Sequence, residues 1–339
     1  MSGFDFAVPE PAIRARVEEW QLDAPGTGLV WLNQTLVASG GDGRVHFGDA
    51  PSGELASLEL HQGAVLALVA DPTMGRVITG GDDGRVMAAT SDGSEQLFHR
   101  PGRWIDSIAV GRKGMIAAGV GKEVLLWQGD EVHSKDMPST AAGLAFDAKG
   151  TSLAAAHYGG VSLIDATHPK RATRLLAWKG SHIGASFSPN GKFVVSVMSE
   201  NALHGWRVKD AVNMAMSGYP TKPRSLSWSA DGRLLASSGA DGAIVWSFAG
   251  REGPMGTSAI SLGERGVQVT AIAWHPTAPM LALGYRDGSV QLCRSEDGDM
   301  LPMRSADGQP IRVVGFDPGG RFLGTLTEAG SLSRVDLAS

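Results

Sequence analysis

The sequence predicts an all-β protein assembled from copies of one small unit, and three observations support this prediction. The chain contains 46 glycines among 339 residues, about twice the usual ~7% share, so it turns often. Hydrophobic residues make up 42% of the chain, which excludes a disordered protein, and the glycines do not recur every third residue, which excludes collagen. Short apolar segments alternate with turn sequences along the whole chain. At ~150 residues per domain the length alone would suggest two domains, but the repeats favour one.

The repeat is marked by an Asp-Gly turn that lies between a strand of small residues and a β-branched strand. Clear copies span residues 39–45, 79–86, 238–244 and 284–290, and degenerate copies span residues 119–124, 157–161, 198–203 and 327–332. The equivalent apolar positions are Val45, Val86, Val124, Val161, Leu203, Ile244, Val290 and Leu332. They lie 37 to 46 residues apart, with a mean of 41. This period is typical of propeller blades, which need ~40–45 residues for four strands.

A second marker lies about 20 residues before the first, where an apolar strand runs into a tight turn such as Pro-Asn-Gly. It occurs in residues 144–150, 184–191, 226–232, 272–276 and 314–319. Each unit is therefore expected to contain a strand, a hairpin turn, a second strand, the Asp-Gly turn, a third strand and an outer strand. Eight such units cover the chain.

The pattern resembles the WD40 repeat, which runs from a Gly-His loop through two turns to Trp-Asp. The loop His is matched by His61 and His182 and more loosely by His99; the Trp is matched by Trp127, Trp206 and Trp246; Asp165 and Asp336 keep only the Asp. The resemblance covers roughly residues 14–339, after a tail of residues 1–13. It implies a single closed β-propeller of four-stranded blades, eight by the repeat count, with seven, the commonest number in the family, as the alternative.

The two ends of the chain are expected to meet in the last blade. The last unit, residues 311–337, supplies only three strands, and the predicted strand at residues 15–22 has no blade of its own. In propellers of this family the N-terminal strand becomes the outer strand of the last blade. The strand at residues 15–22 is therefore expected to lie beside residues 331–337 and close the ring.

The motifs of several functional classes are missing from the sequence. It has no His-Glu-x-x-His pair, phosphate-binding loop or Gly-x-Ser-x-Gly elbow, so we expect no catalytic residue and no cofactor. Cys293 is the only cysteine, which excludes a disulfide framework, a Cys-based zinc cluster and c-type haem within the chain. The net charge of -5 disfavours nucleic acid. No apolar run reaches membrane-spanning length, and the N-terminus lacks the features of a signal peptide, so we expect a cytoplasmic protein. We also expect a monomer.

The aspartates of the Asp-Gly turns have two interpretations, a metal site or a structural role. These residues are Asp42, Asp83, Asp241 and Asp287, one from each of four units. The resemblance implies that such an Asp hydrogen-bonds a loop His and a strand Ser or Thr, a role open to Ser39, Thr79 and Ser237. We therefore predict structural turn aspartates and no metal site.

The loops that lead into the innermost strands combine basic and aromatic residues, with few acidic ones, chiefly Glu264 and Asp307. The residues predicted to bind a partner there are Arg103, Trp104, Trp178, Lys179, Tyr219, Arg224 and Arg312. Loops of the opposite face are richer in acidic residues, including Asp49, Glu54 and Asp130, so the sequence predicts a disc that is positive on one face and negative on the other. Ordinary solvated loops are the alternative interpretation.

Basic and aromatic residues together are typical of interface hot spots. We therefore predict a non-catalytic interaction scaffold that binds an acidic segment of a protein partner. The alternative is a propeller that binds a small ligand or a metal in its central channel, or acts there as an enzyme.

Overall fold

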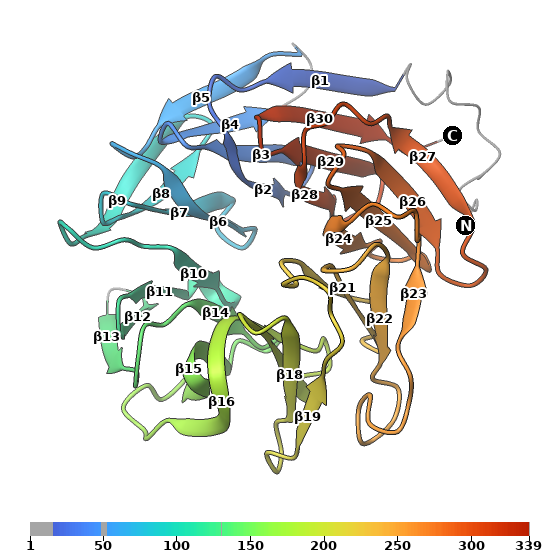
Figure 1. Cartoon of the computed structure of the whole chain (residues 1–339). Helices are drawn as coiled ribbons and strands as arrows, with labels where there is room; N and C mark the ends of the chain where they lie inside the picture. The colour runs from blue at the N-terminus through green and yellow to red at the C-terminus, as the bar shows by residue number, and fades with distance from the viewer. Residues whose placement is uncertain (1–15, 49–52, 130, 339) are drawn as a thin grey trace.

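The computed structural model describes residues 16–48, 53–129 and 131–338 and shows a β-propeller, with antiparallel sheets arranged around a central axis (Figure 1). The described strands form seven hydrogen-bonded sheets, six of four strands and one of six. Each sheet is called a blade here, and the inner strands of the blades surround the axis. The one helical segment of the described chain is a 3-10 turn, η1 (Arg112–Gly114).

The first three blades follow one another in chain order. They consist of β2 (Gly26–Leu32), β3 (Thr35–Gly40), β4 (Arg44–Gly48) and β5 (Leu55–Glu59); then β6 (Val65–Asp71), β7 (Arg76–Gly81), β8 (Arg85–Thr90) and β9 (Gly93–His99); then β10 (Ser107–Val110), β11 (Ile116–Val120), β12 (Glu123–Gln128) and β13 (Glu131–Asp136).

The fourth blade has six strands and the last three have four. The six are β14 (Gly143–Phe146), β15 (Ser152–Asp165), β16 (Arg174–Phe187), β17 (Phe193–Met198), β18 (Ala202–Arg207) and β19 (Asn213–Met216). The later blades consist of β20 (Leu226–Trp228), β21 (Leu234–Ser237), β22 (Ala243–Ser247) and β23 (Ile260–Leu262); β24 (Val269–Trp274), β25 (Met280–Tyr285), β26 (Val290–Arg294) and β27 (Met300–Arg304); and β28 (Ile311–Phe316), β29 (Phe322–Thr327) and β30 (Ser331–Asp336) with β1 (Val17–Gln21).

The described strands form seven hydrogen-bonded sheets, not the eight predicted blades, because the fourth and fifth repeat units share the strand β16. Val161 and Leu203, the markers of the fourth and fifth units, both lie in it. The segment that joins the two units is a short bulge within β16, with Gly160 paired to Ala177 before it and Tyr158 paired to Ser181 after it. Residues 178–180 are unpaired, but β16 continues past them, so its first half pairs with β15 of the fourth unit and its second half pairs with β17 of the fifth.

The long strand β15 accommodates this by folding back on itself. Its turn contains Gly159 and Gly160, whose φ angles of 95° and 144° favour glycine. The backbone N–H of Ala166 then donates to the carbonyl of Thr151 at 2.9 Å, which holds the two ends of the strand side by side.

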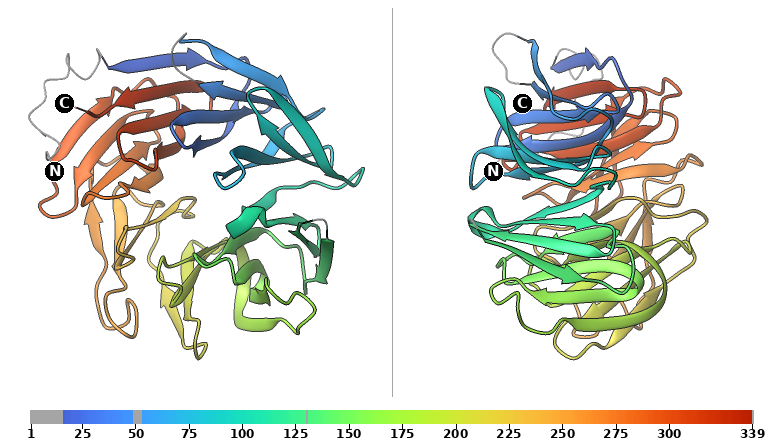
Figure 2. Two further views of the ribbon diagram at one scale, coloured as in Figure 1. Left: turned by 180° about the vertical axis from the view of Figure 1, so that it is seen from behind. Right: turned by 90° about the vertical axis from the view of Figure 1, so that its left-hand side faces the viewer.

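The N-terminal strand completes the last blade, as expected. β1 pairs antiparallel with β30, from Val17 opposite Val335 to Gln21 opposite Ser331. The first and last blades also pack together, because the indole N–H of Trp31 donates to the carbonyl of Gly315 at 2.9 Å. Both views of Figure 2 show the blue and red ends of the chain side by side. The predicted tail of residues 1–13 lies outside the described residues, so that boundary stays a prediction.

The hydrophobic core lies between neighbouring blades. One buried cluster joins Ala236 and Val245 of the β20–β23 blade to Val269, Leu281 and Tyr285 of the next blade. Small residues in the second and third strands let the sheets approach closely. The part of the chain that the structure describes contains no helix with the length and apolar character of a membrane span.

Deletion of residues 1–21 is expected to lower the melting temperature by roughly 5 °C or more. It removes β1, the ion pair between Glu18 and Arg334, and the hydrogen bond from Trp20 Nε1 to the Gly53 carbonyl at 2.7 Å. It also leaves the edge of β30 open to other chains. Differential scanning calorimetry measures the change, with deletion of residues 1–13 as the control expected to melt like wild type. Equal melting of both deletions would contradict a stabilising role for β1.

Candidate functional site

The candidate site lies on one face of the propeller, which we call the top face. Because strands alternate in direction within a blade, the segments that connect one blade to the next emerge on the same face as the turns between second and third strands. The top face therefore carries Arg103, Trp104 and Arg224 in connecting segments, together with Lys179 in the bulge of β16 and Arg312 at the start of β28. Trp178 lies there too, within the bulge of β16.

A buried hydrogen-bond network fixes the top face at the second blade. The imidazole of His61 bonds Asp83 Oδ1 through Nδ1 at 2.9 Å and Thr79 Oγ1 through Nε2 at 2.8 Å. Burial alone would raise the pKa of Asp83, but hydrogen bonds from His61, Gln62 and Arg85 lower it below its usual value. Asp83 therefore ties a connecting loop to a strand, which is a structural role.

The other three turn aspartates do not repeat this network. Asp287 accepts hydrogen bonds from the backbone N–H and hydroxyl of Ser289, at 3.0 and 2.6 Å. Asp42 accepts one from the backbone N–H of Arg44 at 3.3 Å. Asp241 is exposed, and its carboxylate forms no hydrogen bond or ion pair within the described chain. The described residues contain no cluster of three metal-ligating side chains.

Tyr219 does not belong to the partner-binding surface that the sequence predicted. Its side chain is buried, with 7% exposure, and its hydroxyl bonds Ser237 and accepts a hydrogen bond from Trp246 Nε1 at 2.7 Å. Burial raises the pKa of Tyr219 to about 12. Tyr219 thus attaches a connecting loop to strands of its blade, as His61 does in the second blade. An aromatic residue in a loop therefore does not by itself indicate a binding surface.

Three large aromatic side chains remain exposed on the top face: Trp104 at 67%, Tyr158 at 58% and Trp178 at 39%. Trp178 lies flat on His204, with ring centroids 3.9 Å apart and planes at 16°, so its position is fixed. Tyr158 is not among the residues predicted from the sequence to bind a partner. An aromatic residue placed directly before two glycines in a turn of this face was the signal that could have identified it.

His204, the residue beneath Trp178, is buried and uncharged near neutral pH. Burial, assisted by the neighbouring His182, lowers the pKa of His204 to about 4. Its Nε2 atom has no hydrogen-bond partner among the described residues. The stack beneath Trp178 is therefore a contact between two neutral rings.

Arg224 and Arg312 lie together at the mouth of the central channel. They line a cavity of about 570 Å³, which the inner strands of several blades surround through Thr27, Ile183 and Thr270. A guanidinium nitrogen of Arg224 lies 3.7 Å from a carboxylate oxygen of Glu328, so its charge is partly balanced. Two guanidinium groups in one cavity suit an anion.

The top face is not the strongly positive surface that the sequence predicted. The turns between second and third strands bring acidic residues to the same face, among them Asp82, Glu200, Asp241 and Glu328. Arg100 pairs with Glu123, and Arg304 pairs with Asp307 at 2.7 Å. Among the described residues, Arg103, Lys179 and Arg312 form no ion pair. The predicted charge rests only on the loops that enter the inner strands and leaves out the turns that share their face. Asp49 and Asp130 of the opposite face lie outside the described residues.

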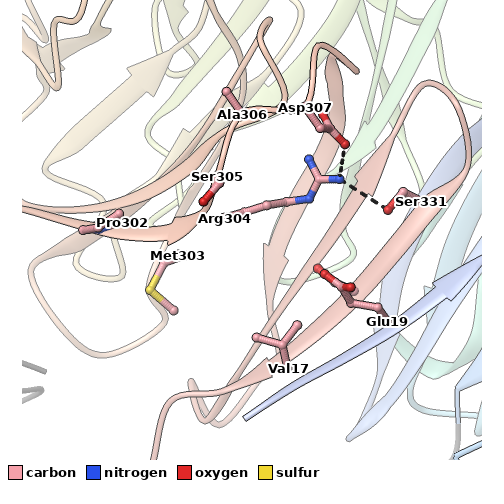
Figure 3. A pocket seen from close by; sticks show the side chains of 10 residues that line it. Val17, Glu19, Pro302, Met303, Arg304, Ser305, Ala306, Asp307 and Ser331 are labelled. Carbon is pink, nitrogen blue, oxygen red and sulfur yellow. Dashed lines mark hydrogen bonds and ion pairs between the residues drawn. The ribbon is translucent and has the colours of Figure 1, made fainter. Parts of the chain in front are cut away.

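Another cavity, of about 600 Å³, lies at the rim between β27 and the strands β1 and β30 (Figure 3). Its one basic side chain, Arg304, is held by Asp307 and by Ser331 Oγ at 3.4 Å. None of the residues predicted to bind a partner lines this cavity. It therefore does not extend the candidate site.

Comparisons with known proteins identify the repeat in part of the chain. The family model described as WD domain, G-beta repeat matches residues 214–246. The model described as Anaphase-promoting complex subunit 4 WD40 domain matches residues 245–318. A comparison with curated proteins gave no significant match.

Solved structures resemble the fold over most of the chain. The computationally designed Ika8 protein superimposes with a TM-score of 0.75 at 18% identity, covering 93% of this chain and 97% of that one. A chain from the crystal structure of the Mitotic Checkpoint Complex has a TM-score of 0.62 at 14% identity, covering 78% of this chain and 88% of that one. At such identities the likeness concerns the fold alone.

Replacement of Asp83 by alanine is expected to lower the free energy of unfolding by about 2 kcal/mol, because it leaves His61 and the Gln62 amide without their acceptor. The matched control is Asp241→Ala, which removes an exposed turn aspartate and should change stability by less than ~0.5 kcal/mol. Urea unfolding measures both. Equal losses would show that Asp83 has no special role.

The stability of the protein is expected to fall as the pH drops from about 6.5 toward 4, partly through His204. Its pKa is lower in the folded chain than the usual value of 6.5, so over this range the unfolded chain binds the proton more readily. Above pH 6.5 His204 is neutral in both the folded and the unfolded chain, and the free energy of unfolding is not reduced. Near pH 4 protonation of the unfolded chain lowers the free energy of unfolding by about 3 kcal/mol. Unfolding titrations across this range should show a shallower decline in His204→Phe, which keeps an aromatic ring beneath Trp178. An identical decline in both proteins would exclude His204 as a source.

Proposed function

We propose that this chain, a WD40-repeat β-propeller, acts as a non-catalytic scaffold that binds a protein partner on its top face. The repeat-family matches and the seven-blade fold provide the premise. The neighbour from the Mitotic Checkpoint Complex, a chain within an assembly, fits such a role. Cytoplasmic location and a monomeric state are part of the proposal and rest on the sequence.

The observation that supports this function best is the exposure of Trp104, Tyr158 and Trp178 on one face. Burying a large aromatic side chain removes 150–250 Å² of surface from water, at ~25 cal/mol per Å². Trp178 is already held in place by its stacking on His204, so its side chain loses little conformational entropy when a partner binds. Exposed aromatic residues on a rigid scaffold are typical of interface hot spots.

The proposed partner segment is acidic. Arg103 adjoins Trp104 and Lys179 adjoins Trp178, and neither basic residue forms an ion pair within the described chain. A carboxylate placed beside either aromatic residue would therefore meet an unneutralised cation. The acidic residues elsewhere on the top face restrict such a segment to these two positions.

A small anion in the channel cavity is the second candidate, because Arg224 and Arg312 both line it. Glu328 already balances part of that charge, which makes this candidate weaker. Native mass spectrometry of the protein purified from its own cells would test it: a bound small molecule released by the variant Arg312→Ala would favour a channel ligand.

The double variant Trp104→Ala/Tyr158→Ala is expected to bind its partner roughly 30-fold more weakly or worse, because two aromatic contact residues are removed. Quantitative affinity purification with mass spectrometry, from the native cells, measures the recovered partners. The matched control is Val132→Ala/Ile260→Ala, which truncates two exposed apolar side chains on outer strands.

The same partners must be recovered with the control variant as with wild type. Equal recovery with the double aromatic variant would refute the top face as the binding surface. Circular dichroism melting of all variants verifies that each is folded.

A further inference from the structure

A second candidate binding surface lies on the bottom face, opposite the aromatic residues. It is a groove of about 750 Å³ between the six-stranded blade and the β20–β23 blade, which are neighbours in Figure 1. Its walls are bottom-face segments: residues 190–193 and 207–210 from one blade, and residues 232–233 and 248–251 from the other. We call it the basic groove.

The floor of the basic groove is apolar. Phe193 and Phe248 are buried there in an edge-to-face contact, with centroids 5.1 Å apart, and Val208 also lines the groove. Gly191, Gly232, Ala249 and Gly250 line the walls without large side chains. The volume falls within the ~300–1,000 Å³ of ligand pockets, so it admits one large apolar side chain and its neighbours.

The walls are basic, although the sequence analysis expected this face to be acidic. Lys192, Arg207, Lys209, Arg233 and Arg251 line the groove, and Asp210 is the one acidic lining residue. Among the described residues, Lys192, Lys209 and Arg233 form no ion pair. Asp231 lies near enough to Arg233 for their charges to interact, whereas Lys192 and Lys209 leave the groove with positive charge in a protein whose net charge is -5.

Arg207 fixes the width of the groove. Its guanidinium donates to both carboxylate oxygens of Asp210 at 2.8 Å and reaches across to Glu252 at 2.7 Å and to the Arg251 carbonyl at 3.1 Å. These contacts hold the two blades together at the groove, and the guanidinium of Arg207 neutralises the carboxylate of Asp210. A preformed groove loses less entropy when a ligand binds.

We propose that the basic groove binds an extended acidic peptide segment of a partner protein, with one large apolar side chain over Phe193 and Phe248. The charge of the walls selects carboxylates, and the apolar floor selects the side chain. Single-stranded nucleic acid fits less well, because the net charge of -5 disfavours it. The proposal concerns the face opposite the top face and does not depend on the function proposed there.

The test starts with a random library of 12-residue peptides selected on the wild-type protein. Enriched peptides are synthesised with a fluorescent label, and their affinities are measured by fluorescence anisotropy. We expect peptides rich in Asp and Glu around an aromatic or long aliphatic residue. Their affinity should fall as salt rises, because the interaction depends on charge.

Two variants change the groove in different ways. Lys209→Glu/Arg233→Glu reverses its charge, and Ala249→Trp fills its wall; each is expected to weaken peptide binding roughly 10-fold or more. The matched control, Lys149→Glu/Lys170→Glu, makes the same charge change on exposed bottom-face residues that do not line the groove. The control and the top-face variant Trp104→Ala/Tyr158→Ala should bind within about twofold of wild type.

Two outcomes would overturn the proposal. The first is that selected peptides are not acidic, or bind the folded groove variants as well as wild type. The second is that no peptide binds while a 20-nucleotide oligothymidine binds through Lys209 and Arg233, which would make the groove a nucleic-acid surface. Because the top-face variant is measured beside the groove variants, failure here is separate from failure of the scaffold function.

Discussion

The whole molecule depends on the burial of each sheet between two neighbouring sheets. A four-stranded blade has two apolar faces and no core of its own, so its stability comes from contact with the blades on either side. The cluster of Leu29 and Leu36 with Leu326 and Leu332 shows that this applies to the first and last blades as well. Everything presented at the surface, including the loops of both faces, is held in place by this continuous packing.

Hydrogen-bond networks near the loops then fix the functional surfaces. His61 with Asp83, and Tyr219 with Trp246, attach connecting loops to strands by different chemistry but with the same effect. Arg207 joins two blades across the bottom face. Rigid loops are useful to a scaffold, because a partner that meets ordered side chains does not have to order them.

Much of the fold could be predicted from the sequence because turns and strand periods are local properties. The Asp-Gly turns and the N-terminal strand were placed correctly, and Thr79 does supply the hydroxyl of the Asp83 network. The number of blades could not be predicted, since it depends on whether Trp178–Gly180 breaks the hydrogen bonding or continues it. The candidate surface was harder to predict than the fold. Tyr219 and Trp178 are both aromatic residues in predicted loops, and only the packing of the folded chain shows that Tyr219 is buried and Trp178 exposed.

The shared strand β16 has a consequence for the candidate surface. Between most neighbouring units a loop connects two separate sheets. The fourth and fifth units are joined within β16 instead, whose first half pairs with β15 and whose second half pairs with β17. Tyr158 and Trp178 both lie at this junction, Tyr158 opposite Ser181 and Trp178 in the bulge of β16. Two of the three exposed aromatic residues of the top face are therefore placed by one strand that two repeat units share.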